Sequence, residues 1–407
     1  MITENPRHRY ALDVVGQLFP GTEVTDARSG DDAARTFAFA PSARRSRLLV
    51  PTRPRDAAAT ALRAYGGRLT RQARWSYRTA ARTLAVTGPA PLRDRLTASS
   101  YDGRRSVGID DYLADALGRP VSVAVHLTPS RANRKPIVQA LGHGERHPLA
   151  FAKVAVDPLT ADLVDREAGA LAALADRKVD HLLVPAVAHH GDFAGHRVLT
   201  LRPLPTWFPG RSPTIADVAA ATREVAGLAD RTRQTLQDSS YWNDVQRRAA
   251  KLAPTPRAER LQQCIAMVTS RFGSADTTFT ASHGDWSPWN MWLTDRGLLV
   301  WDWERFEPRT PEGVDLLHFR LNSQLIRGAW TRAEAGHRLV AEAADVLSHG
   351  DQSDPPAHSV LLYLIHLGLR YEADGQAAAG AALGQLESWL LPAVEAGLAE
   401  LTPMRSS

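Results

Sequence analysis

Cysteine is almost missing from this chain of 407 residues, in which Cys264 is the single example. One thiol excludes an internal disulfide and a thiolate zinc cluster, so we expect neither to stabilise the fold. Long hydrophobic runs are missing too. The apolar run VLLYLIHLGL from Val360 is too short to cross a bilayer, and the opening MITENPRHRY has no apolar core after its basic residues. These absences predict a soluble cytoplasmic protein without a membrane partner.

A strong excess of one charge is also absent, because 49 basic residues face 44 acidic ones for a net charge of +5. Most of the basic residues are arginine, a usage typical of GC-rich genomes, so we do not infer a nucleic-acid partner. His143, His147, His189 and His190 lie in predicted turns of the sheet, and none of them belongs to a His-Glu-x-x-His zinc motif on a helix, so solvated turn histidines are expected. The 44% apolar content predicts well-packed cores in two or three domains.

The segment SHGDWSPWNMWLTDRGLLVWDWE, residues 282–304, is the part of the chain whose spacing implies a reaction. Its apolar runs 291–293 and 298–303 flank the turn-rich tetrapeptide 294–297, which predicts a β-hairpin. If Arg296 is the centre of the turn, Asn290 and Asp302 lie side by side at the open end. An amide oxygen and a carboxylate placed together there suit Mg²⁺, which prefers oxygen ligands.

A further carboxylate, Asp285, precedes Asn290 by five positions in the loop that leads into this hairpin. A carboxylate that can accept a hydroxyl proton, next to two metal ligands, is the arrangement of a phosphoryl-transfer site. The segment therefore predicts a phosphotransferase centre.

Upstream, strand patterns at 121–127, 136–141 and 149–156 predict an antiparallel meander. Lys153 lies in the apolar stretch LAFAKVAV, and a buried ammonium needs a partner. The helical pattern 160–175 offers Glu167, which shares the apolar face that packs inward. This pair predicts a cation positioned for the α and β phosphates of ATP, whereas an edge-strand lysine beside a surface glutamate is the structural alternative.

The loop TPSRANRK, residues 128–135, connects the first two strands of the meander. Small Ser130, with backbone N–H groups and basic side chains, predicts a cover for nucleotide phosphates. The loop contains no glycine, so an ordinary basic hairpin turn is an equal alternative.

Prolines 203 and 205 predict a hinge after the sheet, and helical patterns dominate beyond it. The predicted fold is α+β and two-lobed, with an N-terminal extension at 1–115, a nucleotide-binding sheet lobe at 116–205 and a helical lobe at 206–407. Helical spacing in the later part covers 215–238, 242–252, 257–272, 314–325, 332–347, 360–372 and 381–398.

The order of these elements, with HGDWSPWN from His283 and VWDWE from Val300, resembles the aminoglycoside phosphotransferase and choline kinase family. That family has the protein-kinase-like fold. The resemblance implies that Asp285 is the catalytic base, Asn290 and Asp302 bind Mg²⁺, and Lys153 with Glu167 binds ATP phosphates. It also implies supporting roles: Asp315 braces the catalytic loop, unless it is only a helix cap, and His283 belongs to the loop scaffold.

The expected substrate is a small molecule with a hydroxyl group, such as an amino sugar, a sugar or an amino alcohol. Trp286 and Trp289 are the candidates for contact with it, because aromatic rings stack on sugars or hold cationic amines. A pseudokinase or nucleotide-binding regulatory protein and a protein kinase are the competing interpretations. The sequence does not distinguish ATP from GTP, nor does it give the oligomeric state.

Overall fold

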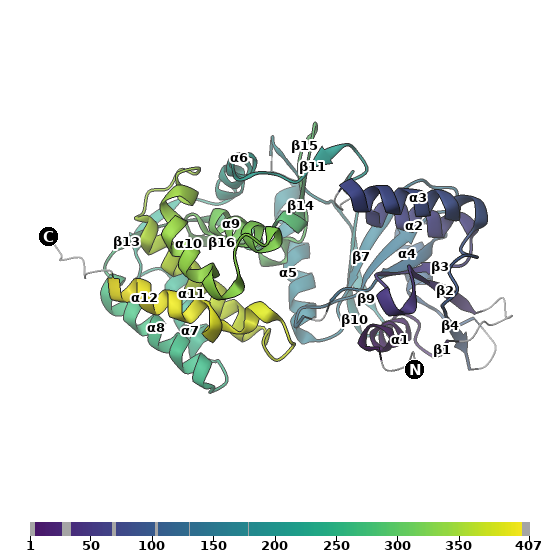
Figure 1. The fold of residues 1–407 in the computed structure, drawn as a ribbon, viewed down its shortest axis with the longest axis horizontal. Coiled ribbons are helices and arrows are strands. Elements are labelled where there is room, and N and C mark those ends of the chain that lie inside the picture. Colours follow the sequence, from purple (N-terminus) through teal and green to yellow (C-terminus); the bar gives the residue numbers. More distant parts are fainter. Residues whose placement is uncertain are drawn as a thin grey trace. The chain divides into compact units, whose positions relative to one another are not determined.

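The computed structural model describes residues 5–26, 34–66, 71–101, 105–129, 131–177 and 179–400, without the side chains of 71–74. The chain divides into two compact units (Figure 1). The first unit comprises Met1–Pro129, Arg134–Ala172 and Pro185–Pro209, and the second comprises Ser130–Asn133, Ala173–Val184 and Gly210–Ser407. The first is built on an antiparallel sheet and the second is mainly helical, which confirms the predicted α+β class.

A nine-stranded sheet in the order β1-β4-β2-β3-β5-β6-β7-β10-β9 organises the first unit. All neighbouring strands are antiparallel. Leu48 and Leu49 of β3 pair with His126 and Val125 of β5, so the sheet continues across the boundary predicted at residues 115 and 116. The strands are β1 (Thr22–Thr25), β2 (Arg35–Ala40), β3 (Leu48–Pro51), β4 (Arg95–Ser100), β5 (Ser122–His126), β6 (Ile137–Leu141), β7 (Ala150–Val154), β9 (Val187–Phe193) and β10 (His196–Leu201).

Alternating side chains give this sheet two apolar faces, because successive residues of a strand point to opposite sides. Phe37 and Phe39 of β2 join one buried cluster, whereas Ala38 and Ala40 join the other. The first cluster is covered by α1 (Pro6–Leu18) and α4 (Ile109–Leu117), and the second by α2 (Arg55–Gly66) and α3 (Arg71–Thr87).

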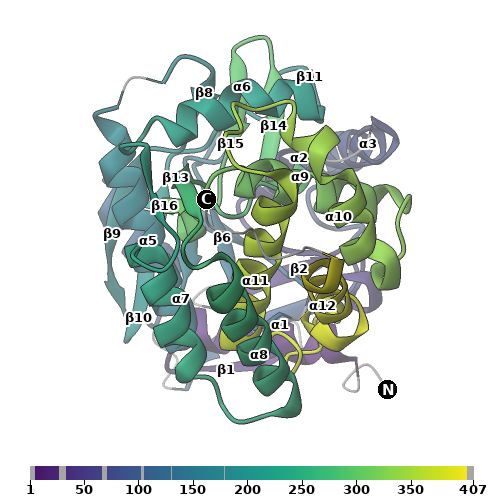
Figure 2. The same ribbon diagram turned by 90° about the vertical axis from the view of Figure 1, so that its left-hand side faces the viewer.

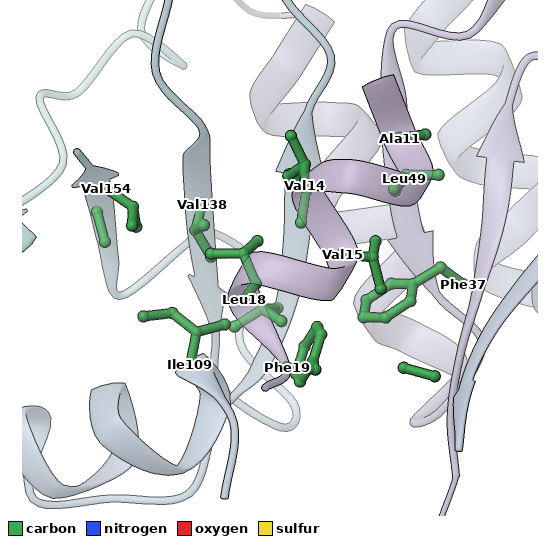
Figure 3. Packing of buried hydrophobic residues seen from close by; sticks show 14 of the residues in the cluster. Ala11, Val14, Val15, Leu18, Phe19, Phe37, Leu49, Ile109, Val138 and Val154 are labelled. Carbon is green, nitrogen blue, oxygen red and sulfur yellow. The ribbon is translucent and has the colours of Figure 1, made fainter. Parts of the chain in front are cut away.

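Helix α1 ties the N-terminal strands to the rest of the sheet. Figure 3 shows its apolar side chains, including Val14 and Leu18, in the same cluster as Phe37 of β2, Val138 of β6 and Val154 of β7. The helix begins at an N-cap, Asn5, whose side-chain oxygen accepts a hydrogen bond from the Arg7 N–H at 3.0 Å. The extension and the predicted sheet lobe therefore share one hydrophobic core.

The second unit is organised around α11 (Pro356–Ala373), an almost wholly buried helix that contacts α7, α8, α9, α10 and α12 (Figure 2). Its elements also include two small sheets, β11-β14-β15-β8 and β12-β13-β16. The other helices of this unit are α6 (Ile215–Ala226), α7 (Ser240–Ala250), α8 (Pro256–Phe272), α9 (Val314–Arg327), α10 (Arg332–Leu347) and α12 (Leu390–Glu400). Its strands are β8 (Leu182–Leu183), β11 (Gly210–Arg211), β12 (Thr232–Thr235), β13 (Asp276–Ser282), β14 (Met291–Thr294), β15 (Gly297–Val300) and β16 (Glu307–Pro311). Helix α5 (Pro158–Ala175) begins in the first unit.

Two predicted helices differ from the structure. The helix expected over 215–238 ends at Ala226, because Thr232–Thr235 pairs as β12 with β13, a long-range pairing that local periodicity does not reveal. The helix expected over 381–398 becomes regular only from Leu390, after two short 3₁₀ turns. No helix in the described part of the chain has the length and apolar character needed to cross a membrane.

Candidate active site

The loop after β13 is held in place by a carboxylate from α9. Asp315 Oδ2 accepts a hydrogen bond from the His283 N–H at 2.8 Å, and its Oδ1 accepts one from the Gly284 N–H at 2.9 Å. The N-cap of α9 is Gly313, so Asp315 uses both oxygens on the loop instead of capping its own helix. Burial raises the pKa of Asp315 to about 6, against the lowering effect of the two amide hydrogen bonds.

Gly284 allows this loop its sharp turn. Its φ of +78° lies in the left-handed region, and a Cβ at this position would come within 2.3 Å of the Arg305 carbonyl oxygen. The Gly284 carbonyl in turn accepts a hydrogen bond from Arg370 Nη1 at 2.6 Å. Arg370 comes from α11, so helices α9 and α11 both fix the backbone of the loop.

His283 is a buried, neutral member of the same loop. Its Nδ1 accepts the Asp285 N–H at 3.2 Å, so the ring proton lies on Nε2, which donates to the Trp301 carbonyl oxygen at 3.2 Å. Burial lowers the pKa of His283 to about 4. A neutral ring with both nitrogens engaged fits the expected scaffold role.

Asp285 lies at the end of this turn with its side chain 28% exposed, which leaves it accessible from outside. Its Oδ1 accepts from His318 Nε2 at 2.9 Å and its Oδ2 accepts from Asn290 Nδ2 at 2.8 Å. Burial alone would raise the pKa of Asp285, but the hydrogen bond from His318 and the charge of Arg370 outweigh it and hold the pKa well below its usual range. The site therefore presents an ionised carboxylate.

The hairpin that follows forms as predicted, but its register differs by one residue. Met291 pairs with Val300 and Thr294 with Gly297, so the loop has two central residues, 295 and 296, and is not centred on Arg296. Asn290 consequently lies opposite Trp301, whose N–H donates to the Asn290 carbonyl oxygen at 3.1 Å. Asp302 is the next residue and has a φ of 65°, a left-handed conformation that aspartate tolerates better than most side chains.

Asn290 is almost fully buried and oriented by Asp285. Its Nδ2 donates to the Asp285 carbonyl oxygen at 3.0 Å as well as to the carboxylate. With the nitrogen committed in this way, Oδ1 is the atom of the amide that can act as a ligand.

The two candidate tryptophans have different environments. Trp286 has 0% exposure and packs edge-on against His283, with ring centroids 5.1 Å apart. Trp289 is 41% exposed. Trp286 is thus part of the loop core, and Trp289 is the one whose ring is accessible to a ligand.

In the first unit, the structure brings Lys153 and Glu167 together as expected. Lys153 Nζ on β7 lies 2.7 Å from Glu167 Oε1 and 2.6 Å from Oε2 on α5. The side chains are 7% and 0% exposed, so this is a buried ion pair and not a surface contact.

Breaking this pair should cost much stability, because it leaves a charge buried without its main partner. We expect Lys153→Met to lower the free energy of unfolding by about 3–5 kcal/mol, and Lys153→Met/Glu167→Leu to recover part of the loss. Urea-induced unfolding measures both. The control is Arg119→Met, which breaks the exposed Arg119–Glu145 pair and should cost about 1 kcal/mol or less; equal losses for the two single variants would contradict the prediction.

In the loop predicted to cover phosphates, Arg134 and Asn133 contact other residues of the protein. Arg134 stacks on Tyr10, with its guanidinium carbon 3.5 Å from the ring centroid. Asn133 Nδ2 donates to Glu304 Oε1 at 3.3 Å. Ser130 lies outside the described residues.

Three residues of the site had not been predicted: His318, Tyr363 and Arg370. They come from α9 and α11, which the chain places beside the loop only by helix packing. The available signal was the occurrence of polar side chains next to apolar residues, in the stretch LLHF of α9 and along the apolar helix α11. His318, Tyr363 and Arg370 are all buried.

No protein-family profile and no curated protein matches the chain. Solved structures do match: the choline kinase LicA from Streptococcus pneumoniae is 15% identical over 72% of this chain and 99% of its own, with a TM-score of 0.47. Aminoglycoside phosphotransferase APH(4)-Ia, in a complex with ADP and hygromycin B, is 10% identical over 74% of this chain and 99% of its own, with a TM-score of 0.46. Aminoglycoside phosphotransferase APH(3'')-Id from Streptomyces rimosus, in complex with ADP and streptomycin, is 14% identical over 57% of this chain and 89% of its own, with a TM-score of 0.38.

Each TM-score is below 0.5, so these structures assign no role to any residue of this chain. These three solved structures are those of small-molecule kinases.

Proposed function

We propose that the protein transfers the γ-phosphate of ATP to a hydroxyl group of a small molecule. The observation that carries the proposal is the Asp285 carboxylate, which is ionised, accessible and held by hydrogen bonds to both oxygens. In-line transfer breaks the bond between the γ-phosphorus and the β–γ bridging oxygen and forms a bond to the acceptor oxygen. The acceptor proton moves to Asp285, and ADP leaves.

Asn290 and Asp302 are the proposed ligands of a Mg²⁺ ion, because an amide oxygen and a carboxylate are donors of the kind that this ion prefers. Mg²⁺ is usually bound by one or two carboxylates together with waters and substrate phosphates, so a site need not have a complete cage of protein ligands. The described residues contain no group of three or more histidine, cysteine or acidic side chains that could hold a metal. When bound, the ion would neutralise charge on the phosphate oxygens. Asn290 would present Oδ1, because its nitrogen is held by Asp285.

Lys153 is proposed to contact the α and β phosphates, with Glu167 holding its ammonium group. The bidentate contact at 2.6 and 2.7 Å supports this role, because it fixes a flexible side chain in one orientation. The acceptor is proposed to be an amino sugar, a sugar or an amino alcohol. The exposed ring of Trp289 supports this class, because such a ring can stack on a sugar or hold a cationic amine.

The test is an ADP-release assay with ATP and Mg²⁺ against a panel of amino sugars, sugars and choline-like amines. We expect acceptor-dependent ADP release with at least one compound, and a phosphorylated product by mass spectrometry. A nucleotide that binds without turnover on any acceptor would instead favour a regulatory nucleotide-binding protein. Phosphate transfer to a generic protein substrate would favour a protein kinase.

A further inference from the structure

A chain of hydrogen bonds runs from Asp285 into the core of the second unit. His318 Nε2 lies 2.9 Å from Asp285 Oδ1, and His318 Nδ1 lies 2.9 Å from the Tyr363 hydroxyl oxygen. The side chain of His318 is 3% exposed, and Tyr363 is 1% exposed. These hydrogen bonds connect the loop after β13 to α9 and α11, the helices that also hold the backbone of that loop.

The direction of each hydrogen bond follows from the chemistry of the groups. An ionised carboxylate only accepts, so His318 Nε2 carries the proton and donates it to Asp285. Burial lowers the pKa of His318, which keeps the ring neutral. Its Nδ1 is therefore an acceptor, and the Tyr363 hydroxyl donates to it.

The two oxygens of the Asp285 carboxylate have different hydrogen-bond partners. Within the described part of the chain, Oδ1 accepts from His318 and, at 3.4 Å, from Ser287 Oγ, whereas Oδ2 accepts from Asn290 alone. A carboxylate oxygen has two lone-pair directions. Oδ2 therefore keeps one direction open for an incoming hydroxyl group.

We propose that His318 and Tyr363 are positioning residues that fix the rotation of the Asp285 carboxylate, so that Oδ2 faces the hydroxyl group of the acceptor. The inference deepens the proposed function and rests on it. Neither residue takes the substrate proton, because the His318 nitrogen next to Asp285 is already protonated. Their contribution is orientation, and misplacement of a reacting group by about 1 Å can cost about 10²-fold in rate.

Other charged and titratable groups around Asp285 have different tasks. His283 from the loop holds the Asp285 N–H, Asp315 from α9 holds the two preceding N–H groups, and Arg370 from α11 holds the Gly284 carbonyl. They fix the backbone, whereas His318, which is held by Tyr363, contacts the carboxylate. A change at His318 should therefore affect turnover without releasing the loop.

The test compares His318→Gln with His318→Asn, two substitutions that each place a polar atom at the position of one ring nitrogen. The Nε2 of glutamine replaces the histidine Nε2 and can still donate to Asp285. The Oδ1 of asparagine replaces Nδ1, so it can still accept from Tyr363 but cannot donate to Asp285. We expect kcat of the glutamine variant to stay within about 10-fold of wild type and that of the asparagine variant to fall about 10²-fold, with KM for ATP unchanged in both.

The control is His358→Asn, which changes a buried histidine that stacks on Phe272, away from the loop, and should leave kcat unchanged. Equal kcat values for the asparagine and glutamine variants at His318, or a change confined to KM, would overturn the proposal. If either variant fails to fold by circular dichroism, Tyr363→Phe replaces it. That change removes only the hydroxyl group, and we expect kcat to fall about 10-fold; an unchanged kcat would overturn the proposal.

A measurement without turnover separates this proposal from the proposed function. Nitrogen-15 NMR of the histidine-labelled protein, with His318 assigned from its missing signal in His318→Gln, should show a neutral ring protonated at Nε2. A ring protonated at Nδ1 would overturn the hydrogen-bond chain whether or not the protein transfers phosphate. Absence of transfer by the wild type, with the Nε2 form present, would refute the proposed function and the positioning role while leaving the hydrogen bonds as structural contacts.

Discussion

Asp285→Asn should lower the turnover of phosphate transfer by about 10²- to 10⁴-fold, the usual contribution of general acid–base catalysis. Asparagine keeps the size of the side chain but removes the negative charge that allows Asp285 to take up the hydroxyl proton. The fold should tolerate the change, because His318 can exchange its ring proton between nitrogens and accept from the new amide while donating to Tyr363. Nucleotide affinity should therefore stay near that of wild type.

Steady-state kinetics with the best acceptor, together with calorimetry of ADP binding, separates the two effects. Asp238→Asn is a matched control, because it changes an exposed aspartate of the same unit. An Asp285→Asn variant with near-normal turnover would remove Asp285 from the mechanism. Loss of nucleotide binding together with turnover would point to a structural role for this carboxylate.

The second large effect is expected at Asp302, where replacement by alanine should abolish Mg²⁺-dependent nucleotide binding. The carboxylate is the charged member of the proposed pair of ligands, and hard cations depend on charged oxygen ligands. Binding measured by calorimetry with Mg²⁺ should fall to the level seen in EDTA. Unchanged affinity would remove Asp302 from the metal site.

Two controls make the Asp302 result specific. Asp295→Ala removes a carboxylate from the exposed turn of the same hairpin and should leave binding unchanged. Asp302→Asn is the control for the left-handed backbone, because asparagine adopts a φ of 65° at a lower cost than alanine. If Asp302→Asn also binds nucleotide more weakly with Mg²⁺, the loss comes from the charge and not from the backbone.

Local patterns predicted those parts of the site whose partners lie close in the chain. The Lys153–Glu167 contact spans 14 residues and follows from a buried lysine and the inward face of the next helix. The hairpin was predicted from its two apolar runs and its turn residues. Its register was not, because Thr294 and Gly297 close a loop of two residues, and a shift of one position changes every cross-strand partner.

Contacts made by distant elements could not be predicted in this way. His318 lies 33 residues from Asp285, and Tyr363 lies 45 residues beyond His318. Both occur in helical segments whose apolar spacing indicates burial, but spacing does not show which loop a buried polar group meets. The same limit applies to β12, which pairs with a strand more than 40 residues later.

The pairing of β3 with β5 gives residues 1–115 a protective role toward the rest of the sheet. If these residues were removed, β5 would become an edge strand, and its backbone N–H and C=O groups could pair with another chain. The buried side chains of β5 and β6 that pack with α1, among them Val138, would face water at the same time. A chain shortened to residues 116–407 would thus be prone to aggregate by strand addition, which gives the protein a physical reason to keep its N-terminal strands.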